Sequence, residues 1–126
     1  MKIATRQVGD ATILDLTGDI TLFNTPEIRK SMLALLKEQR AAQLIVNMTA
    51  VPYIDSSGIA ALVEGLKVSR DLKSRFALFG LSKSAKTVLE LTHLIRVFEV
   101  HPTEQDALER PASGTASAGA GGGEKP

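Results

Sequence analysis

Short apolar runs separated by turn residues open the chain. Residues 3–8 and 11–17 are two such runs, and Gly9-Asp10 lies between them. A Gly-Asp dipeptide between apolar runs is typical of a tight turn that joins two strands. The pattern therefore predicts an N-terminal β-hairpin, whose second strand ends at Gly18.

A helix is predicted after the hairpin, beginning near Thr25. The Thr25 side chain can cap a helix, and Pro26 suits the first helical position. The apolar positions that follow recur at the spacing of one helix face: Ile28, Met32, Leu35 and Leu36. This stretch therefore predicts an amphipathic helix.

Further strands and helices alternate downstream. Residues 43–48 and 76–79 are short apolar runs, typical of strands buried on both faces, and residues 95–100 are predicted to form a last strand. Ser82 and Thr103 are the expected caps of a third and a fourth helix.

The predicted element order is β-β-α-β-α-β-α-β-α. Strands that are separated by helices need crossover connections, and crossovers place the strands parallel. We therefore expect an α/β fold with a mixed sheet, parallel in its centre, with about four helices and an N-terminal hairpin.

Composition divides the chain at residue 110. The 126 residues correspond to one domain at roughly 100–200 residues per domain. Residues 111–126 hold five of the ten Gly and no side chain more apolar than Ala. Such a segment cannot bury enough surface to offset its ordering entropy. We expect one domain over residues 1–110 and a disordered Gly/Ala/Ser-rich tail over 111–126.

Charge and residue types disfavour several classes of function. Fifteen Lys and Arg against fourteen Asp and Glu give a formal charge of +1, so the chain has no broad cationic field for direct nucleic-acid binding. The absence of Cys excludes disulfides, thiolate metal sites and thiol catalysis. No apolar run approaches the roughly 18–20 residues that span a bilayer, and the N-terminus has no apolar stretch of signal-peptide type. A cytoplasmic protein without membrane insertion is expected.

Candidate chemistry is expected at the carboxyl ends of the parallel strands, where open α/β sheets place their sites. Asp55-Ser56-Ser57-Gly58 stands at such an end, directly before the second predicted helix. In a structural interpretation, Asp and Ser cap the helix and Gly eases the turn. In a functional interpretation, a Ser hydroxyl here accepts a phosphoryl group, whose charge the helix N–H groups stabilise. Residue types alone favour the structural interpretation.

The wider pattern resembles a known family. Residues 53–59 resemble the phosphorylation motif of STAS-domain anti-sigma factor antagonists. Residues 16–20 resemble the family's Leu-Thr-Gly-Glu-Leu/Ile loop, 44–48 its central strand, and 79–92 its later strand–helix unit. The resemblance covers residues 3–108 and implies the STAS fold.

The resemblance implies a binding switch rather than an enzyme. In such proteins the unphosphorylated form binds an anti-sigma factor, a serine kinase of histidine-kinase-like ATPase fold, and thereby frees a sigma factor. The kinase then phosphorylates the first Ser of the motif with Mg-ATP, the complex dissociates, and a serine phosphatase resets the switch. Ser56 is thus the implied phosphoacceptor, Asp55 and Gly58 are implied to shape its loop, and Ser57 to cap the helix. Nucleotide and metal belong to the partner, so no cofactor or metal is expected in this chain.

The partner is expected to contact the loop edge of the sheet and the second helix, whose exposed face is predicted to carry Ser57, Ala61, Glu64 and Val68. Thr21 stands where antagonists commonly have Asp, which favours a different or weaker partner contact unless Asp19 compensates. Ala60 replaces a favoured Gly and stiffens the helix start. The expected partner-binding residues are Asp19, Thr21, Asp55, Ser57, Gly58, Ala61 and Glu64.

Two alternative functions keep the fold: an accessory subunit of a membrane transport system, which Thr21 favours, and a signalling scaffold tuned by Ser56. A hydrolase is disfavoured because the motif lacks the first Gly of Gly-x-Ser-x-Gly. A metal pair of His93 and His101 is disfavoured in a chain without Cys.

Two further groups of residues have more than one interpretation. Of Leu22 and Phe23, one is expected to pack against the first helix as a hydrophobic staple, and the other is left open as part of a docking patch. A basic stretch is expected to form a solvated face rather than an anion site: Lys67, Arg70, Lys73 and Arg75.

Overall fold

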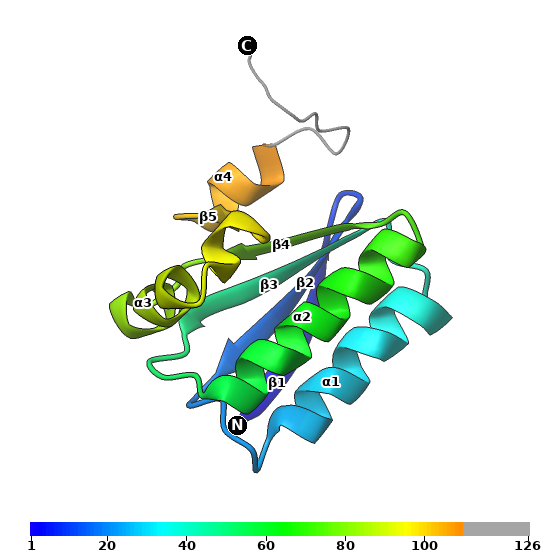
Figure 1. Cartoon of the computed structure of the whole chain (residues 1–126). Coiled ribbons are helices and arrows are strands. Elements are labelled where there is room, and N and C mark those ends of the chain that lie inside the picture. The colour runs from blue at the N-terminus through cyan, green and yellow to red at the C-terminus, as the bar shows by residue number, and fades with distance from the viewer. Residues whose placement is uncertain (110–126) are drawn as a thin grey trace.

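The computed structural model describes residues 1–109 (Figure 1). The strands are β1 (Lys2–Val8), β2 (Ala11–Thr17), β3 (Gln43–Ala50), β4 (Arg75–Phe79) and β5 (Glu99–His101). The helices are α1 (Thr25–Leu33), α2 (Ser56–Asp71), α3 (Lys83–Leu91) and α4 (Glu104–Glu109). A π-helical turn (Ala34–Glu38) extends α1, and a 3₁₀ turn (Leu94–Arg96) precedes β5. The predicted tail, 111–126, lies outside the described residues.

One five-stranded sheet organises the fold. Its strands lie in the order β1-β2-β3-β4-β5, and only the β1–β2 pair is antiparallel. The hairpin turns at Gly9, whose φ of +59° is a conformation that glycine adopts at little cost. The predicted hairpin and parallel centre are confirmed.

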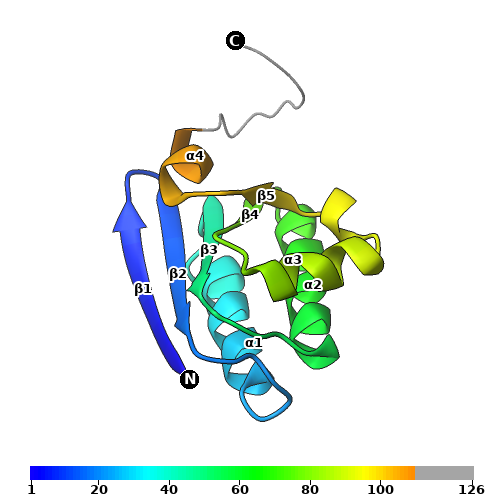
Figure 2. The ribbon, with the colours of Figure 1, turned by 90° about the vertical axis from the view of Figure 1, so that its left-hand side faces the viewer.

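The helices cover the two faces of the sheet unequally. Helices α1, α2 and α3 lie on one face, where they bury the main core (Figure 2). On the other face, Ala107 of α4 packs in a smaller cluster with Ile45 and Phe79. Strand β3 therefore buries side chains on both faces, as its continuous apolar run predicts.

The last strand is shorter than predicted. Residues 95–100 were expected to form it, but Leu94–Arg96 is a 3₁₀ turn and β5 covers only Glu99–His101. His93 opens that turn with a φ of +63°. The apolar run reflects packing of the turn against the core edge, where Phe98 is buried and its ring lies 6.3 Å from that of Phe76.

Of the caps predicted for the first, third and fourth helices, the last two are confirmed. The Ser82 hydroxyl accepts a hydrogen bond from the Ala85 N–H at 3.1 Å, and the Thr103 hydroxyl accepts one from the Asp106 N–H at 3.2 Å. The cap at Thr25 is wrong, because this residue is buried inside the first turn of α1 and Asn24 occupies the cap position.

A buried ion pair ties β5 and α4 to the sheet. The Arg75 side chain is only 6% exposed and pairs with Glu99 of β5. Its guanidinium also donates to the Ala107 carbonyl at 2.8 Å, and the His101 Nε2 lies 2.7 Å from the Glu99 carboxylate. The expectation that Arg75 shares a solvated basic face is therefore wrong, because its strand position turns it onto the face that α4 covers.

Candidate functional site

The loops that follow β2 and β3 lie together at one edge of the sheet. The Ile20 N–H donates to the Tyr53 carbonyl at 2.9 Å, and the Asp55 N–H donates to the Ile20 carbonyl at 3.0 Å. This bridge extends the parallel pairing of β2 and β3 beyond the sheet. The two loops that the sequence predicts at the carboxyl edge are therefore one structural unit.

Asp55 is the N-cap of α2, so the cap that the resemblance implied at Ser57 is wrong, because Ser57 lies inside the first turn. Asp55 is also the central acceptor of this unit. Its Oδ1 accepts hydrogen bonds from the Gly58 N–H at 3.1 Å and from the Ser57 hydroxyl at 2.6 Å. Its Oδ2 accepts the Leu22 N–H at 3.0 Å. The bond from Ser57, together with those from the Gly58 and Leu22 amides, holds the pKa of Asp55 below its ordinary value. One carboxylate thus stabilises both the helix start and the neighbouring loop.

The two motif serines have different environments. Ser57 is partly buried, donates to Asp55, and lies 3.5 Å from the Thr25 hydroxyl oxygen of α1. Ser56 is exposed at the first residue of α2, and its hydroxyl takes no part in the side-chain hydrogen bonds found within residues 1–109. Of the two motif serines, Ser56 is therefore the exposed one.

A shallow groove of about 600 Å³ begins at Ser56 and follows α2. Apolar side chains form most of it, with one acidic and one basic residue on its rim. The lining residues are Ser56, Ile59, Ala60, Val63, Glu64, Lys67 and Leu94. The groove therefore joins the exposed hydroxyl to an apolar surface between α2 and the 3₁₀ turn before β5.

The predicted exposed face of α2 is rotated from the observed one. Ala61 was expected to be exposed but is only 6% exposed. Glu64 turns toward α1, where its Oε1 lies 2.5 Å from the Arg29 Nε. The side that faces solvent instead carries Ala60 and Lys67. Ile59, Leu62 and Leu66 are buried, so their spacing does define the buried face, and the expectation placed Ala61 and Glu64 on the wrong side of the helix.

Asp19 and Thr21 lie in the loop between β2 and α1. Asn24, which the sequence reasoning missed, holds this loop: its Oδ1 accepts the Thr21 N–H at 2.8 Å, and its Nδ2 donates to the Asp19 carbonyl at 2.7 Å. The signal for Asn24 was its residue type, since Asn is a preferred residue at helix starts. Asp19 is exposed and Thr21 is partly buried.

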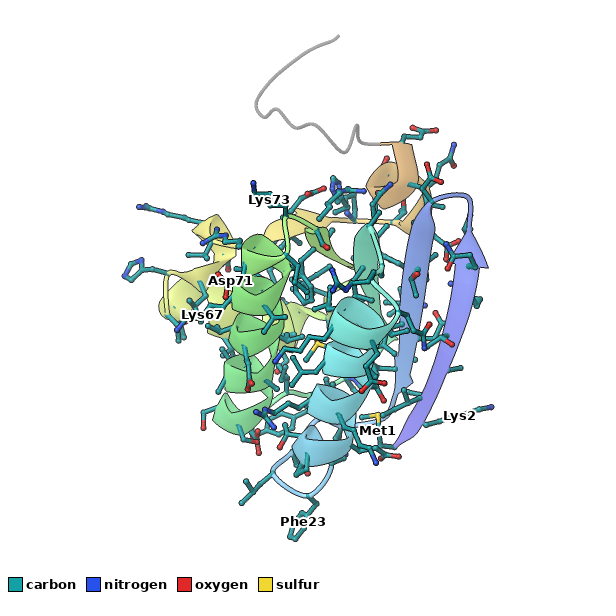
Figure 3. The ribbon with its side chains drawn as sticks, turned by 90° about the vertical axis from the view of Figure 1, so that its right-hand side faces the viewer. Met1, Lys2, Phe23, Lys67, Asp71 and Lys73 are labelled. Atoms are coloured by element: carbon teal, nitrogen blue, oxygen red, sulfur yellow. The ribbon has the colours of Figure 1, made fainter. Side chains whose placement is uncertain are left out.

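The hydrophobic staple is not observed. Leu22 is 69% exposed and Phe23 is 96% exposed. Figure 3 shows Phe23 pointing away from the body of the molecule. Neither side chain packs against α1 as the sequence suggested, so both are available at the surface beside Asp55.

Neither a metal-binding cluster nor a membrane-spanning helix occurs among residues 1–109. Within residues 1–109, no group of three or more His, Asp or Glu side chains is placed to hold a metal ion. No helix in that range is long and apolar enough to cross a membrane.

The remaining basic residues of the predicted solvated face are exposed: Lys67, Arg70 and Lys73.

Comparison with known proteins gives consistent matches. The STAS domain family model matches residues 2–107. The anti-sigma-B factor antagonist of Listeria monocytogenes is 29% identical over 87 residues, which cover 69% of this chain and 75% of that protein. Another anti-sigma-B factor antagonist, from Listeria innocua, matches to the same extent.

Solved structures share the fold at low identity. An anti-sigma factor antagonist from Mycobacterium paratuberculosis superposes with a TM-score of 0.76 and 19% identity, covering 85% of this chain and 90% of that one. The phosphorylated form of the Bacillus cell fate determinant SpoIIAA gives a TM-score of 0.69 and 18% identity, covering 86% of this chain and 98% of that one. The family match spans nearly all of the described residues, and the chain belongs to the STAS domain family.

Proposed function

We propose that this protein is an anti-sigma factor antagonist that works as a phosphorylation-controlled binding switch. Its unphosphorylated form binds an anti-sigma factor with serine kinase activity, and this binding frees a sigma factor. Phosphorylation of Ser56 ends the binding, and a serine phosphatase restores it. The observation that carries the proposal is the exposed Ser56 hydroxyl at the start of α2, beside an apolar groove.

The position of Ser56 suits a reversible charge switch. A phosphoserine carries about −1.5 to −2 charges at neutral pH, and the N–H groups at the start of α2 stabilise an anion there. The neighbouring Asp55 is already a carboxylate with a lowered pKa. Phosphorylation therefore concentrates negative charge at one point of the docking surface, and it repels a partner whose facing patch is acidic.

The groove along α2 supplies the apolar part of the same surface. Ile59, Val63 and Leu94 line it next to Ser56. Apolar contacts of this kind provide affinity, whereas the phosphate at their edge decides whether they form. In this proposal the chain performs no catalysis, and Mg-ATP is held by the partner kinase. The relatives that are themselves anti-sigma-B factor antagonists support the same role.

The test compares three tagged proteins in lysate of the native organism: wild type, Ser56→Ala and Ser56→Asp. We expect wild type and Ser56→Ala to retain an anti-sigma factor with a kinase-type ATPase domain, and Ser56→Asp to lose it. Ser57→Asp is the matched control, because it adds the same charge at a partly buried neighbour. The binding of Ser57→Asp is compared with that of Ser56→Asp only after an unfolding curve confirms that Ser57→Asp is folded.

Two results would contradict the proposal. Retention of the same kinase by all three proteins would show that the charge at residue 56 controls nothing. Retention of membrane transport proteins by all three would favour the accessory-subunit function of a STAS domain instead.

A further inference from the structure

Two large apolar side chains project from the loop between β2 and α1. Phe23 is 96% exposed and Leu22 is 69% exposed. Figure 3 shows Phe23 at an extremity of the molecule, pointing into solvent. Single exposed apolar residues are ordinary, but two adjacent ones at the tip of a loop beside the candidate site form a compact apolar tip. We call Leu22 and Phe23 the apolar tip.

The loop that carries the apolar tip is held by its own hydrogen bonds. Asn24 accepts the Thr21 N–H and donates to the Asp19 carbonyl, at 2.8 and 2.7 Å. The Phe23 N–H also lies 3.3 Å from the Thr21 hydroxyl oxygen. A tip that is ordered before it binds loses less conformational entropy on docking than a flexible one does.

Asp55 joins the apolar tip to the phosphoacceptor. Its Oδ2 accepts the Leu22 N–H at 3.0 Å, while its Oδ1 caps the helix that begins at Ser56. The apolar tip and Ser56 therefore flank one carboxylate, on loops that are bridged by backbone hydrogen bonds. A partner that covers Ser56 is close enough to cover the apolar tip as well.

The charge around the apolar tip selects between kinds of partner. Asp19 and Glu27 are the charged residues between residues 18 and 28, Asp55 is the charged residue of the loop after β3, and no Lys or Arg occurs from residue 18 to residue 28. An apolar anchor for the anionic leaflet of a membrane is normally flanked by basic residues. An apolar tip without basic residues in its own loop lacks the electrostatic attraction to anionic lipid, so a protein surface is the favoured partner.

We propose that the apolar tip is the anchor of the docking surface: Leu22 and Phe23 insert into an apolar socket on the protein partner, and Asp55 positions the anchor. This rests on the proposed function, because the partner is the anti-sigma factor kinase. Thr21 supplies no carboxylate for the partner in this arrangement. The loop instead contacts the partner through the two apolar side chains that follow Thr21.

The test uses the kinase that Ser56→Ala retains from lysate. It measures the affinity of each variant of this protein for that purified kinase. Phe23→Ser is expected to weaken binding by at least about tenfold, as loss of an aromatic anchor does. Phe23→Leu keeps an apolar side chain and should retain most of the affinity. Val8→Ser is the matched control, an exposed apolar residue in the hairpin at the opposite end of β2, and should bind as wild type does.

Asn24→Ala tests the positioning of the anchor. It removes two hydrogen bonds within the loop and leaves both apolar side chains and Ser56 in place. We expect a several-fold weaker affinity, with phosphorylation of Ser56 by excess kinase unchanged.

Because Phe23 is almost fully exposed, its variants should keep the thermal midpoint of wild type, which circular dichroism checks.

The outcomes separate this inference from the proposed function. Wild-type affinity in Phe23→Ser, with binding still lost in Ser56→Asp, overturns the anchor and leaves the switch intact. Kinase binding by Ser56→Asp that equals wild-type binding overturns the switch itself. Sedimentation of wild type, but not Phe23→Ser, with phosphatidylserine vesicles would assign the apolar tip to a membrane. A wild-type dimer that Phe23→Ser abolishes would assign it to self-association. Either result overturns the anchor.

Discussion

A Cβ atom on Gly58 would lie 2.5 Å from the Cγ2 atom of Ile20. It would also lie 2.6 Å from the Cγ1 atom of Ile54, so the first turn of α2 rests directly on both loops of the candidate site. The position of Ser56 relative to the loop after β2 depends on this close approach. Glycine is required here for space, since its φ is not in the left-handed region.

Gly58→Ala should destabilise the protein although alanine is the better helix former. The added methyl group forces Ile20 or Ile54 out of its buried position, and overpacking of this kind costs about 1–3 kcal/mol. Urea unfolding followed by circular dichroism measures the change. An unchanged or increased free energy of unfolding would mean that the loops can move apart to admit a side chain.

Ala60→Gly provides the opposite substitution two residues later. Ala60 is exposed, so the change removes no core contact and acts through helix propensity. The free energy of unfolding should fall by roughly 1 kcal/mol. The same urea experiment checks it, and a change near zero would indicate that the first turns of α2 are frayed in solution.

Ser56 and Ser57 should have separable roles: Ser56 accepts the phosphate, and Ser57 supports the Asp55 cap by its hydrogen bond. With the partner kinase and Mg-ATP, wild type and Ser57→Ala should each gain one phosphate per chain by intact-mass spectrometry, and Ser56→Ala should gain none. Ser57→Ala should also have a lower thermal midpoint, because it loses the hydrogen bond to Asp55. Phosphate on Ser57 in the Ser56→Ala protein would identify the wrong acceptor.

Glu99 should make the protein sensitive to acid. Burial alone would raise its pKa, but the bonds from His101 and Arg75 lower it from 4.5 to about 2. A carboxylate whose pKa is lower in the folded state adds stability above the unfolded pKa. That contribution is present above about pH 4.5 and is lost as the pH falls toward 2.

Glu99→Gln should therefore flatten the dependence of stability on pH between 4.5 and 2, measured by urea unfolding at each pH. At neutral pH the variant should be less stable, because it leaves the buried Arg75 guanidinium without its carboxylate, and breaking such a pair costs about 3–5 kcal/mol. Equal pH profiles for wild type and Glu99→Gln would contradict the role of Glu99.

Local signals in the sequence were enough to predict most of the architecture. Gly9-Asp10 marks the hairpin, the continuous apolar runs mark the buried parallel strands, and Ser82 and Thr103 cap their helices as expected. The prediction was wrong where an apolar run packs without becoming a strand, as at residues 94–96. It was also wrong at Thr25, where Asn24 is one residue away and just as suitable for a cap.

The sequence by itself determined the element order, the α/β class and the resemblance of the Asp55–Gly58 motif to a phosphorylation site, because periodicity, turn residues and short motifs act over neighbouring positions. Only the tertiary structure decided that Glu64 pairs with Arg29 of α1, that Arg75 is buried against Glu99, and that Leu22 and Phe23 project beside Asp55. These features depend on contacts between residues distant in the chain. No local pattern specifies them, because they follow from how whole elements pack together.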